Sequence, residues 1–328
     1  MICIKKVLVI DMEASIIIPT YNREKNVFEI LKLLNKQICT SNKIEIIICD
    51  SNSRNRIKLL SFIKSFKTKN VIYSNIKINH QALKRNHGVK ISSAKNIIFI
   101  DDDCMPSNKF MYYHLRKLNL ERKKEIYCGS VKYCKSKTNN NLINYRDSRL
   151  IKLSDVNSKN IPAKNFISMN MSCKLNILKS NIFDSRFRHY GFEDFEFAYR
   201  LKSKFKFILI EALINHKDDR SFNDFLKKHY YLGKFGIQDI IKINHKAYKN
   251  TIFYKIENNF LIKFLKKIIF FKLILKIFIS FLIRIEKKLI NNHPLIYRAG
   301  IFLAFLSGSI ERSPEVNSTY KDLAKWYK

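Results

Sequence analysis

The sequence predicts an α/β fold with a mostly parallel sheet that helices cover on both faces. Short, continuously apolar runs alternate along residues 15–100 with segments that have helical spacing. Continuous apolar strands are typical of parallel sheets, which are buried on both faces. Hydrophobic residues make up 46% of the 328-residue chain. This content is enough to bury a core, and it excludes intrinsic disorder.

Four strands and three helices are expected in the first hundred residues. The first helix is indicated by Val27, Ile30, Leu31 and Leu34, which recur at three- and four-residue spacing. The predicted strands are 15–18, 44–49, 71–73 and 96–100, and the predicted helices are 24–37, 57–66 and 81–92. Residues 104–190 have a mixed pattern. Beyond them we expect a helix at 193–203, a strand at 205–210 and a helix at 221–241.

Three consecutive aspartates, Asp101, Asp102 and Asp103, follow the fourth predicted strand. Because like charges repel, such a cluster requires a cation or strong hydrogen-bond donors nearby. Alternate residues of an extended segment point the same way, so Asp101 and Asp103 can face one site. Carboxylate oxygens suit Mg²⁺ or Mn²⁺, which bind together with substrate phosphates. We therefore expect a divalent-cation site here; the alternative is a solvated acidic turn.

A second acidic pair, Glu193 and Asp194, follows Gly191 at the start of a predicted helix. Negative charge in a first turn stabilises a helix through its dipole, so simple capping is one interpretation. The other is a general base that abstracts a hydroxyl proton. His216, beyond the strand predicted at 205–210, is a candidate further metal ligand because imidazole suits Mn²⁺ sites. Its alternative is an ordinary structural histidine.

The seven cysteines are odd in number and contain no Cys-x-x-Cys pair. This usage indicates free thiols in a reducing compartment rather than a disulfide framework or a zinc site. Residues 1–10 are interpreted as an extension before the first strand. A signal peptide is not expected, because the stretch is short and carries two lysines.

The net charge of +35 is spread along the whole chain. Residues 1–220 carry 42 basic and 20 acidic side chains, and residues 221–328 carry 20 and 7. A dedicated nucleic-acid-binding protein concentrates its charge on one segment or face, so nucleic acid is not the expected partner. The even excess still favours contact with anionic lipid headgroups, phosphates or acidic polymers.

Residues 259–285 form a basic, apolar and aromatic-rich stretch. Its longest uncharged run, 277–283, is too short to cross a bilayer. We expect a helix that lies in a membrane interface, with its lysines reaching anionic headgroups. A second apolar stretch, 299–310, could dock beside it. The alternative is a pair of helices that pack in a core or join two copies of the chain.

Four motifs resemble those of the family 2 glycosyltransferases, which have the GT-A fold. They are Ser15-Ile-Ile-Ile-Pro-Thr-Tyr-Asn-Arg23, Leu83-Lys-Arg-Asn-His-Gly88, Phe99-Ile-Asp-Asp-Asp103 and Gly191-Phe-Glu-Asp-Phe-Glu196. The second is similar to the family's Arg-Asn-x-Gly helix and the third to its Asp-x-Asp strand end. The fourth, with Asn170-Met-Ser172 before it, also resembles the galactosyltransferase-type half of chondroitin-polymerase-like enzymes. The resemblance covers residues 14–220.

The resemblance implies a donor-binding role for eight residues. Thr20, Tyr21 and Arg23 would line the nucleotide pocket, and Pro19 would shape the turn. Asp50 would bind the base, for which uracil is the commonest choice in the family. The remaining donor-side residues would be Arg85 near the diphosphate or sugar, Asp101 near the ribose, and Asp102.

The resemblance also assigns the metal and the chemistry. Asp103 and His216 would hold Mn²⁺ or Mg²⁺ against the diphosphate. Asp194 would be the catalytic base, and Glu193 would orient hydroxyl groups of the donor or acceptor.

The implied function is inverting, metal-dependent transfer of a sugar from a nucleotide sugar, expected to be a UDP-sugar. The acceptor would be a hydroxyl of a glycan or a lipid-linked molecule in bacterial surface polysaccharide synthesis. Residues 1–220 would form the catalytic domain, with a nucleotide-binding half at 14–104 and an acceptor half at 105–220. Residues 221–328 would form a helical tail that holds the protein on the inner face of the cytoplasmic membrane. The alternatives are a basic nucleic-acid- or polyanion-binding protein and a catalytically inactive scaffold.

Overall fold

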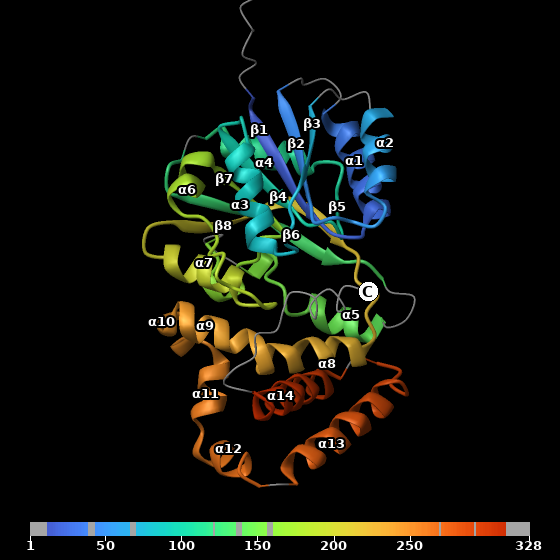
Figure 1. Ribbon diagram of the computed structural model, residues 1–328, viewed down its shortest axis with the longest axis vertical. Coiled ribbons are helices and arrows are strands. Elements are labelled where there is room, and N and C mark those ends of the chain that lie inside the picture. The colour runs from blue at the N-terminus through green and yellow to red at the C-terminus, as the bar shows by residue number, and fades with distance from the viewer. Residues whose placement is uncertain are drawn as a thin grey trace, which may run out of the picture.

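A central sheet with helices on both faces forms the upper part of the computed structural model, and a layer of C-terminal helices lies below it (Figure 1). The structure describes residues 12–38, 43–65, 70–120, 122–135, 140–155, 160–268, 270–291 and 293–312. The predicted extension at 1–10 therefore lies outside the described residues, as do Cys3 and Cys39. The other five cysteines are free thiols.

The first half of the sheet is parallel and follows the sequence prediction closely. Strands β1 (Ala14–Thr20), β2 (Ile44–Asp50), β3 (Val71–Asn75) and β4 (Asn96–Ile100) lie in the order β3-β2-β1-β4. The helices between them are α1 (Glu24–Ile38), α2 (Arg56–Ser65) and α3 (Gln81–Ile91). Every residue of β1, β2 and β4 is buried, which explains their continuous apolar runs.

The second half of the sheet is mixed. Strands β5 (Cys104–Pro106), β6 (Glu125–Tyr133), β7 (Asn170–Lys174) and β8 (Lys206–His216) complete the order β4-β7-β6-β8-β5. The pairs β4–β7, β6–β7 and β5–β8 are antiparallel, and β6–β8 is parallel. The helices here are α4 (Phe110–Leu118), α5 (Asn140–Asp147), α6 (Leu175–Ser180) and α7 (Glu193–Leu201), with 3-10 turns at Leu153–Asp155 and Ala163–Asn165.

Two apolar layers flank the sheet because alternate residues of each strand point to opposite faces. Ile16 and Ile18 face the layer that includes α1, α2 and α4, and Ile17 faces the layer with α3, α6 and α7. Gly88 permits the close approach of α3, since a Cβ there would lie 2.5 Å from Cγ2 of Ile17. This contact gives a packing reason for the glycine of the Arg-Asn-x-Gly helix.

The C-terminal helices depart from the prediction in one place. The expected helix at 221–241 is α8 (Phe222–Tyr231), a π-helical turn (Leu232–Gly236) and α9 (Ile237–Ile243), followed by α10 (His245–Lys249) and α11 (Ile252–Asn258). The single helix expected over 259–285 is wrong, because a turn separates α12 (Phe260–Leu265) from α13 (Phe271–Glu286). Leu275 of α13 is buried beside α14 (Pro294–Ile310), while an ion pair ties Lys266 back to Glu257 of α11. These contacts fix the two helices in different directions.

Helix α14 packs as expected beside α13, and it also contacts α8. Leu142 and Tyr145 of α5 share an apolar cluster with Phe222 of α8 and Tyr297 of α14. Side chains from both sides of the predicted domain boundary at residue 220 thus pack together, and that boundary stays a prediction. Among the described residues, no helix combines the length and the hydropathy needed to span a bilayer.

Candidate active site

The carboxyl ends of β1, β2 and β4 meet at one edge of the sheet, and the predicted donor-side residues lie there. Thr20 is opposite Asp50 in the register of β1 and β2, and Pro19 is buried one position earlier. Asp101 follows β4 directly. Strand ends at a switch in strand order are where α/β proteins bind ligands.

Asp102 stabilises the turn after β1 through hydrogen bonds. Its carboxylate accepts hydrogen bonds from the Thr20 hydroxyl at 2.9 Å, from the backbone N–H of Tyr21 at 3.4 Å and from Arg23 at 3.0 Å. Burial raises the pKa of Asp102 to about 6, and the charge of Arg23 opposes this rise. Arg23 also pairs with Asp103 at 2.5 Å. The structure thus brings Thr20, Tyr21 and Arg23 together around the aspartate cluster.

Asp50 is fully buried at the end of β2. It accepts hydrogen bonds from the backbone N–H of Ser53 at 3.0 Å, from the Ser53 hydroxyl, and from the Tyr73 hydroxyl at 2.8 Å. These bonds shape the loop after β2. Contact of Asp50 with a nucleotide base stays a prediction.

Arg85 lies between the donor-side residues at the sheet edge and the acidic pair at the start of α7. Its Nη2 lies 2.8 Å from an oxygen of Asp101, and its Nη1 lies 3.8 Å from an oxygen of Asp194. The side chain is 3% exposed, and neither Nε nor Nη1 has a hydrogen-bond partner among the described residues. Burial acts to lower the pKa of Arg85, but Asp101 and Asp194 outweigh it, so the guanidinium stays charged. Buried donors of this kind favour a substrate as their partner.

Glu193 and Asp194 directly follow a turn whose two residues have left-handed backbone conformation. Gly191 has φ of 101° and Phe192 has φ of 69°, and α7 begins immediately after them. Asp194 does not cap the helix; its carboxylate accepts from the backbone N–H of Ser168 at 3.1 Å and from the Ser168 hydroxyl at 2.5 Å. Burial, followed by the charge of Asp194, raises the pKa of Glu193 to about 7.

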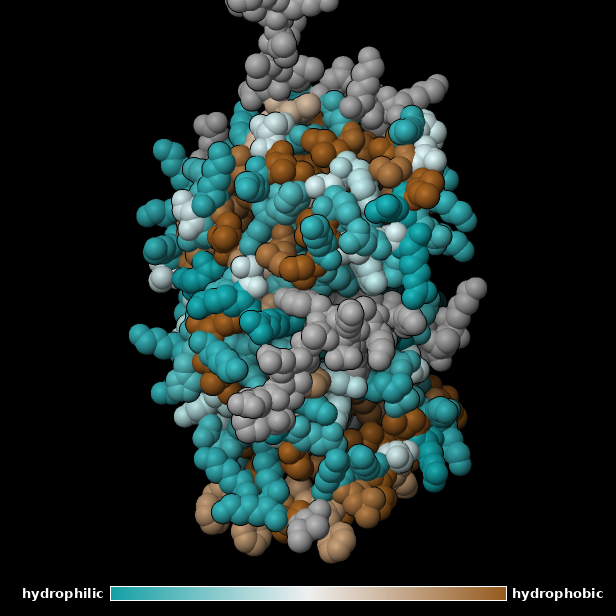
Figure 2. Space-filling view, in the orientation of Figure 1, coloured by the Kyte–Doolittle hydropathy of each residue, from teal (hydrophilic) through white to brown (hydrophobic). Residues whose placement is uncertain are grey.

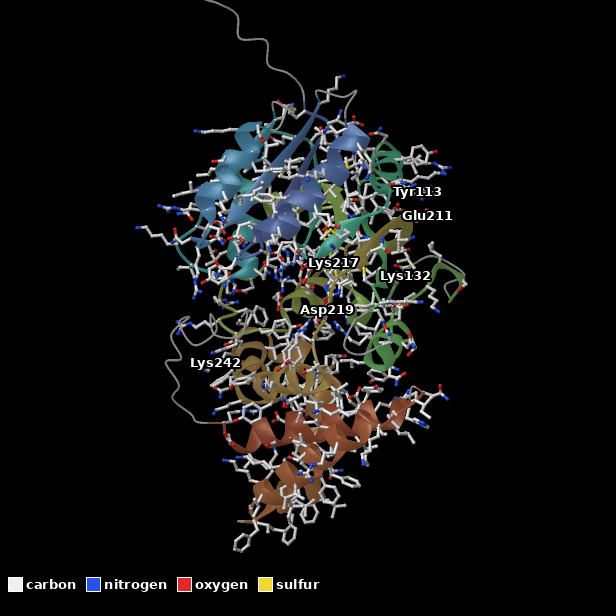
Figure 3. All side chains as sticks on the ribbon, turned by 90° about the vertical axis from the view of Figure 1, so that its right-hand side faces the viewer. Tyr113, Lys132, Glu211, Lys217, Asp219 and Lys242 are labelled. Atoms are coloured by element: carbon white, nitrogen blue, oxygen red, sulfur yellow. The ribbon has the colours of Figure 1, made fainter. Side chains whose placement is uncertain are left out.

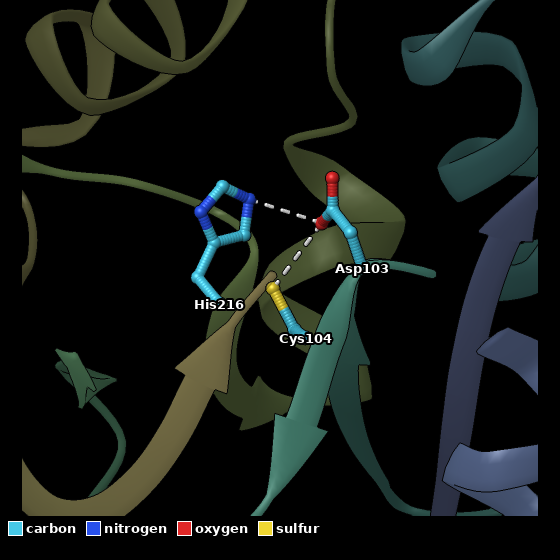
Figure 4. Close-up of side chains that lie close together, drawn as sticks. All are labelled: Asp103, Cys104 and His216. Carbon is cyan, nitrogen blue, oxygen red and sulfur yellow. Dashed lines mark hydrogen bonds and ion pairs between the residues drawn. The ribbon is translucent and has the colours of Figure 1, made fainter. Parts of the chain in front are cut away.

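Asp103 and His216 come together through the register of β5 and β8, in which Cys104 is opposite His216 (Figure 4). Nε2 of His216 lies 3.2 Å from Oδ1 of Asp103, and the Cys104 thiol donates to the same oxygen at 3.5 Å. The next residue, Lys217, donates its backbone N–H to the Asp103 carbonyl at 2.8 Å. Lys217 and Asp219 mark the end of this segment between the sheet and the C-terminal helices (Figure 3).

The chemistry of these side chains fits a hard divalent cation. Burial would raise the pKa of Asp103, but His216 and Arg23 hold it well below its usual range, so the carboxylate is ionised. Burial raises the pKa of the Cys104 thiol, as do the neighbouring aspartates, so a thiolate that would select softer metals is disfavoured. Nδ1 of His216 is buried without a hydrogen-bond partner among the described residues. A carboxylate and an imidazole remain, which suits Mn²⁺ or Mg²⁺.

Three further residues contribute to the site without having been singled out from the sequence. Lys84 is buried, and its Nζ donates to the Thr20 carbonyl at 3.0 Å and to Asn79 at 2.7 Å. Ser168 holds Asp194, and Cys104 donates to Asp103. Lys84 could have been found from its place beside Arg85 in the same motif. Ser168 has no comparable signal, because the tertiary fold alone brings it to Asp194.

A family model described as Glycosyl transferase family 2 matches residues 15–187, more than half of the chain. The chain belongs to glycosyl transferase family 2. This family 2 chain is 30% identical over 120 residues to the uncharacterized glycosyltransferase YfnE of Bacillus subtilis, covering 36% of this chain and 30% of the relative. It is 30% identical over 93 residues to the poly(ribitol-phosphate) beta-N-acetylglucosaminyltransferase TarP of Staphylococcus aureus, covering 28% of each chain. The matched segments thus span less than a third of these relatives.

Solved structures confirm the predicted fold of this family 2 chain. The crystal structure of S. aureus TarS 1-349 in complex with UDP-GlcNAc matches 92% of this chain and 90% of that one, with a TM-score of 0.53 and 15% identity. The mannosyltransferase PcManGT of Pyrobaculum calidifontis, in complex with GDP-Man and Mn²⁺, matches 71% of this chain and 64% of that one, with a TM-score of 0.51 and 13% identity. At such identity the likeness concerns the fold alone. The galactosyltransferase-type character of the acceptor half stays a prediction.

Proposed function

We propose that this chain is an inverting, metal-dependent glycosyltransferase that moves a sugar from a UDP-sugar to a hydroxyl group of a glycan or a lipid-linked acceptor. The observation that carries the proposal is the position of Arg85 between Asp101 and Asp194. This buried cation joins the donor edge of the sheet to the candidate base, and its Nε and Nη1 make no hydrogen bond within the described residues. A substrate that bears phosphate or hydroxyl groups supplies the missing partner.

The residues divide the chemistry between them. The turn held by Asp102 and Arg23 receives the nucleotide, and Arg85 binds the diphosphate or the donor sugar. Asp103 and His216 would hold a divalent cation, which would supply positive charge for the departing nucleoside diphosphate. Asp194, fixed by Ser168, accepts the proton of the acceptor hydroxyl as the new bond forms. One base opposite one leaving group gives a single displacement, which inverts the anomeric centre.

The comparisons favour the same donor and acceptor classes. The relative TarP is described as acting on poly(ribitol-phosphate) with an N-acetylglucosaminyl group, and TarS was crystallised with UDP-GlcNAc. Mn²⁺ accompanies the sugar nucleotide in the PcManGT structure. These observations support a UDP-sugar donor, a divalent metal and a role in bacterial surface polysaccharide synthesis.

The test is sugar-nucleotide hydrolysis and transfer by the purified chain, screened across UDP- and GDP-sugars with and without Mn²⁺. We expect turnover that needs the metal and that is lost in Asp103→Ala. Asp194→Asn should lower kcat by about 10²- to 10⁴-fold, the usual contribution of a general base, without weakening UDP binding. Full activity of either variant contradicts its assigned role. A thermal shift with DNA and none with UDP and Mn²⁺ would favour a nucleic-acid-binding protein, and UDP binding without turnover would favour an inactive scaffold.

The proposed localisation at the cytoplasmic face of the membrane rests on the C-terminal helices. An apolar face is formed by exposed side chains of α12, α13 and the turn between them: Phe260, Leu261, Phe264, Phe270, Leu273, Ile274, Ile277, Phe278 and Phe281. It lies at the end of the molecule farthest from the sheet, where hydrophobic residues gather at the bottom of Figure 2. Lys263, Lys276 and Arg284 are exposed on the same helices, and Lys267 is exposed just beyond the end of α12. Apolar side chains flanked by lysines match an anionic lipid surface.

Vesicle flotation tests this localisation. The protein should float with vesicles of phosphatidylcholine and phosphatidylglycerol, and float poorly with phosphatidylcholine alone. The double variant Phe264→Ser, Phe278→Ser should abolish flotation, whereas Tyr112→Ser, an exposed aromatic change on α4, should not. Unchanged flotation of the double variant contradicts the proposal. A wild-type dimer that the double variant dissociates would instead assign the apolar face to a second copy of the chain.

A further inference from the structure

A pocket of about 330 Å³ lies on the α8 side of the candidate base. Its walls come from the end of β6, from α5, from the turn before α7 and from α8. The lining residues are Tyr133, Arg146, Tyr190, Gly191, Phe192, Phe225, Lys228, His229 and Leu232. The side chains of this wall are aromatic, apolar or basic, and none is a carboxylate.

Arg146 forms the fixed part of the pocket wall. Its side chain is 10% exposed, with the guanidinium carbon 4.2 Å from the centre of the Tyr133 ring. It donates to Asp218 and, at 3.2 Å, to the Tyr133 hydroxyl. Arg220 pairs with the same carboxylate, so Asp218 is shared by two guanidinium groups. Asp218 therefore lies between two guanidinium groups behind the pocket.

Lys228 adds a third positive charge. Its Nζ lies 4.0 Å from the centre of the Tyr190 ring, and no carboxylate of the described residues is within ion-pair distance of it. Burial lowers the pKa of Lys228, as do the like charges of Arg220 and Arg146, while Asp218 and Asp103 act in the opposite direction. A half-buried ammonium group beside two guanidinium groups is stabilised by an anion that enters the pocket.

The pocket lies beside the reacting groups. Gly191 and Phe192 line it and are followed directly by Glu193 and Asp194. On its other side, the Tyr133 ring lies 5.0 Å from the ring of His216, centre to centre. A ligand held here is therefore next to both the candidate base and the candidate metal ligand.

We propose that this pocket binds a phosphate group of a substrate, with Lys228 and Arg146 as the cations that contact it. A phosphate accepts several charge-assisted hydrogen bonds at once, so it can pair with the Lys228 ammonium and the Arg146 guanidinium together. The aromatic walls formed by Tyr133, Tyr190 and Phe225 leave room for a sugar or polyol attached to it. This inference rests on the proposed function for its place in catalysis.

The phosphate has two possible sources with the same chemistry. It belongs either to a phosphate-bearing acceptor, such as a glycan or lipid phosphate, or to the diphosphate of the donor. The first source places the acceptor hydroxyl at Asp194. If the phosphate belongs to the donor diphosphate, the donor site extends past His216 into this pocket.

Calorimetry with glycerol 3-phosphate and with inorganic phosphate tests the pocket. Lys228→Gln should weaken binding of both probes by about tenfold, the loss expected for one charge-assisted contact. Lys227→Gln is the matched control, because this neighbouring lysine is exposed and pairs with Asp224. Thermal unfolding verifies that both variants are folded. Absence of binding to the wild type, or equal binding by wild type and Lys228→Gln, overturns the proposal.

Repeating the titration at saturating UDP and Mn²⁺ distinguishes the sources. Glycerol 3-phosphate that still binds, with UDP affinity unchanged in Lys228→Gln, assigns the pocket to the acceptor. Glycerol 3-phosphate that UDP displaces, with UDP affinity lowered in Lys228→Gln, assigns it to the donor diphosphate. Failure of the proposed function has a different signature, which is phosphate binding without any binding of UDP.

Discussion

Replacing Glu193 by glutamine tests how much an ionised Glu193 carboxylate destabilises the folded protein. Burial and then the charge of Asp194 raise the pKa of Glu193 from 4.5 to about 7, against the opposing effect of Arg85. The unfolded chain keeps the ordinary value. The ionised carboxylate is therefore less favourable in the folded protein than in the unfolded chain, whereas a glutamine amide has no charge to bury.

The sign and size of the effect follow from the two pKa values. Below pH 4.5 the carboxyl is protonated in both states, so it adds no penalty. As the pH rises from 4.5 to about 7, the unfolded chain loses the proton first and the stability of the folded protein falls. Above that range the penalty is complete, at about 3 kcal/mol for a difference of this size. Glu193→Gln should remove it.

Urea denaturation followed by circular dichroism measures the effect. At pH 8.5 the free energy of unfolding of Glu193→Gln should exceed that of the wild type by up to about 3 kcal/mol, and the gain should shrink toward zero near pH 4.5. The control is Glu29→Gln, at an exposed carboxylate of α1 that pairs with Lys217, which should not raise the free energy of unfolding at pH 8.5. An equal difference at both pH values, or a loss of stability at pH 8.5, would refute the reasoning.

Two further predictions concern packing and the donor loop. Gly308→Ala should lower stability by about 1–3 kcal/mol, because a Cβ there would lie 1.9 Å from the Tyr230 carbonyl oxygen. Gly300→Ala should cost less, since its Cβ would meet only side-chain atoms; equal melting temperatures of the two variants would contradict this. Tyr73→Phe removes the hydroxyl that donates to Asp50 at 2.8 Å, and should lower the free energy of unfolding by about 1–2 kcal/mol. A urea midpoint equal to that of the wild type would contradict it.

The nucleotide-binding half of the fold could be predicted well because its signals are local. Continuous apolar runs gave β1, β2 and β4 to within a residue or two, and three- and four-residue spacing gave α1. The middle of the chain could not be read in this way. The antiparallel strand β7 lies between β4 and β6, an order that depends on pairing between segments far apart in sequence.

The local sequence pattern also gave a wrong prediction for the C-terminal helices. The stretch 259–285 is apolar and basic throughout, so its composition favours one continuous helix. The break between α12 and α13 comes from tertiary contacts, namely the burial of Leu275 beside α14 and the ion pair between Lys266 and Glu257. The sequence from 266 to 270 contains no proline or glycine.

The sequence by itself determined the strands of the parallel half, the aspartate cluster that follows β4 and the family motifs. Only the tertiary structure decided which of these side chains meet. The register of β5 and β8 brings His216 to Asp103, and the packing of α3 and α7 on one face of the sheet brings Arg85 to Asp194. The physical reason is that hydrophobic periodicity reports how each segment is buried, whereas strand pairing and register depend on the packing of the whole chain.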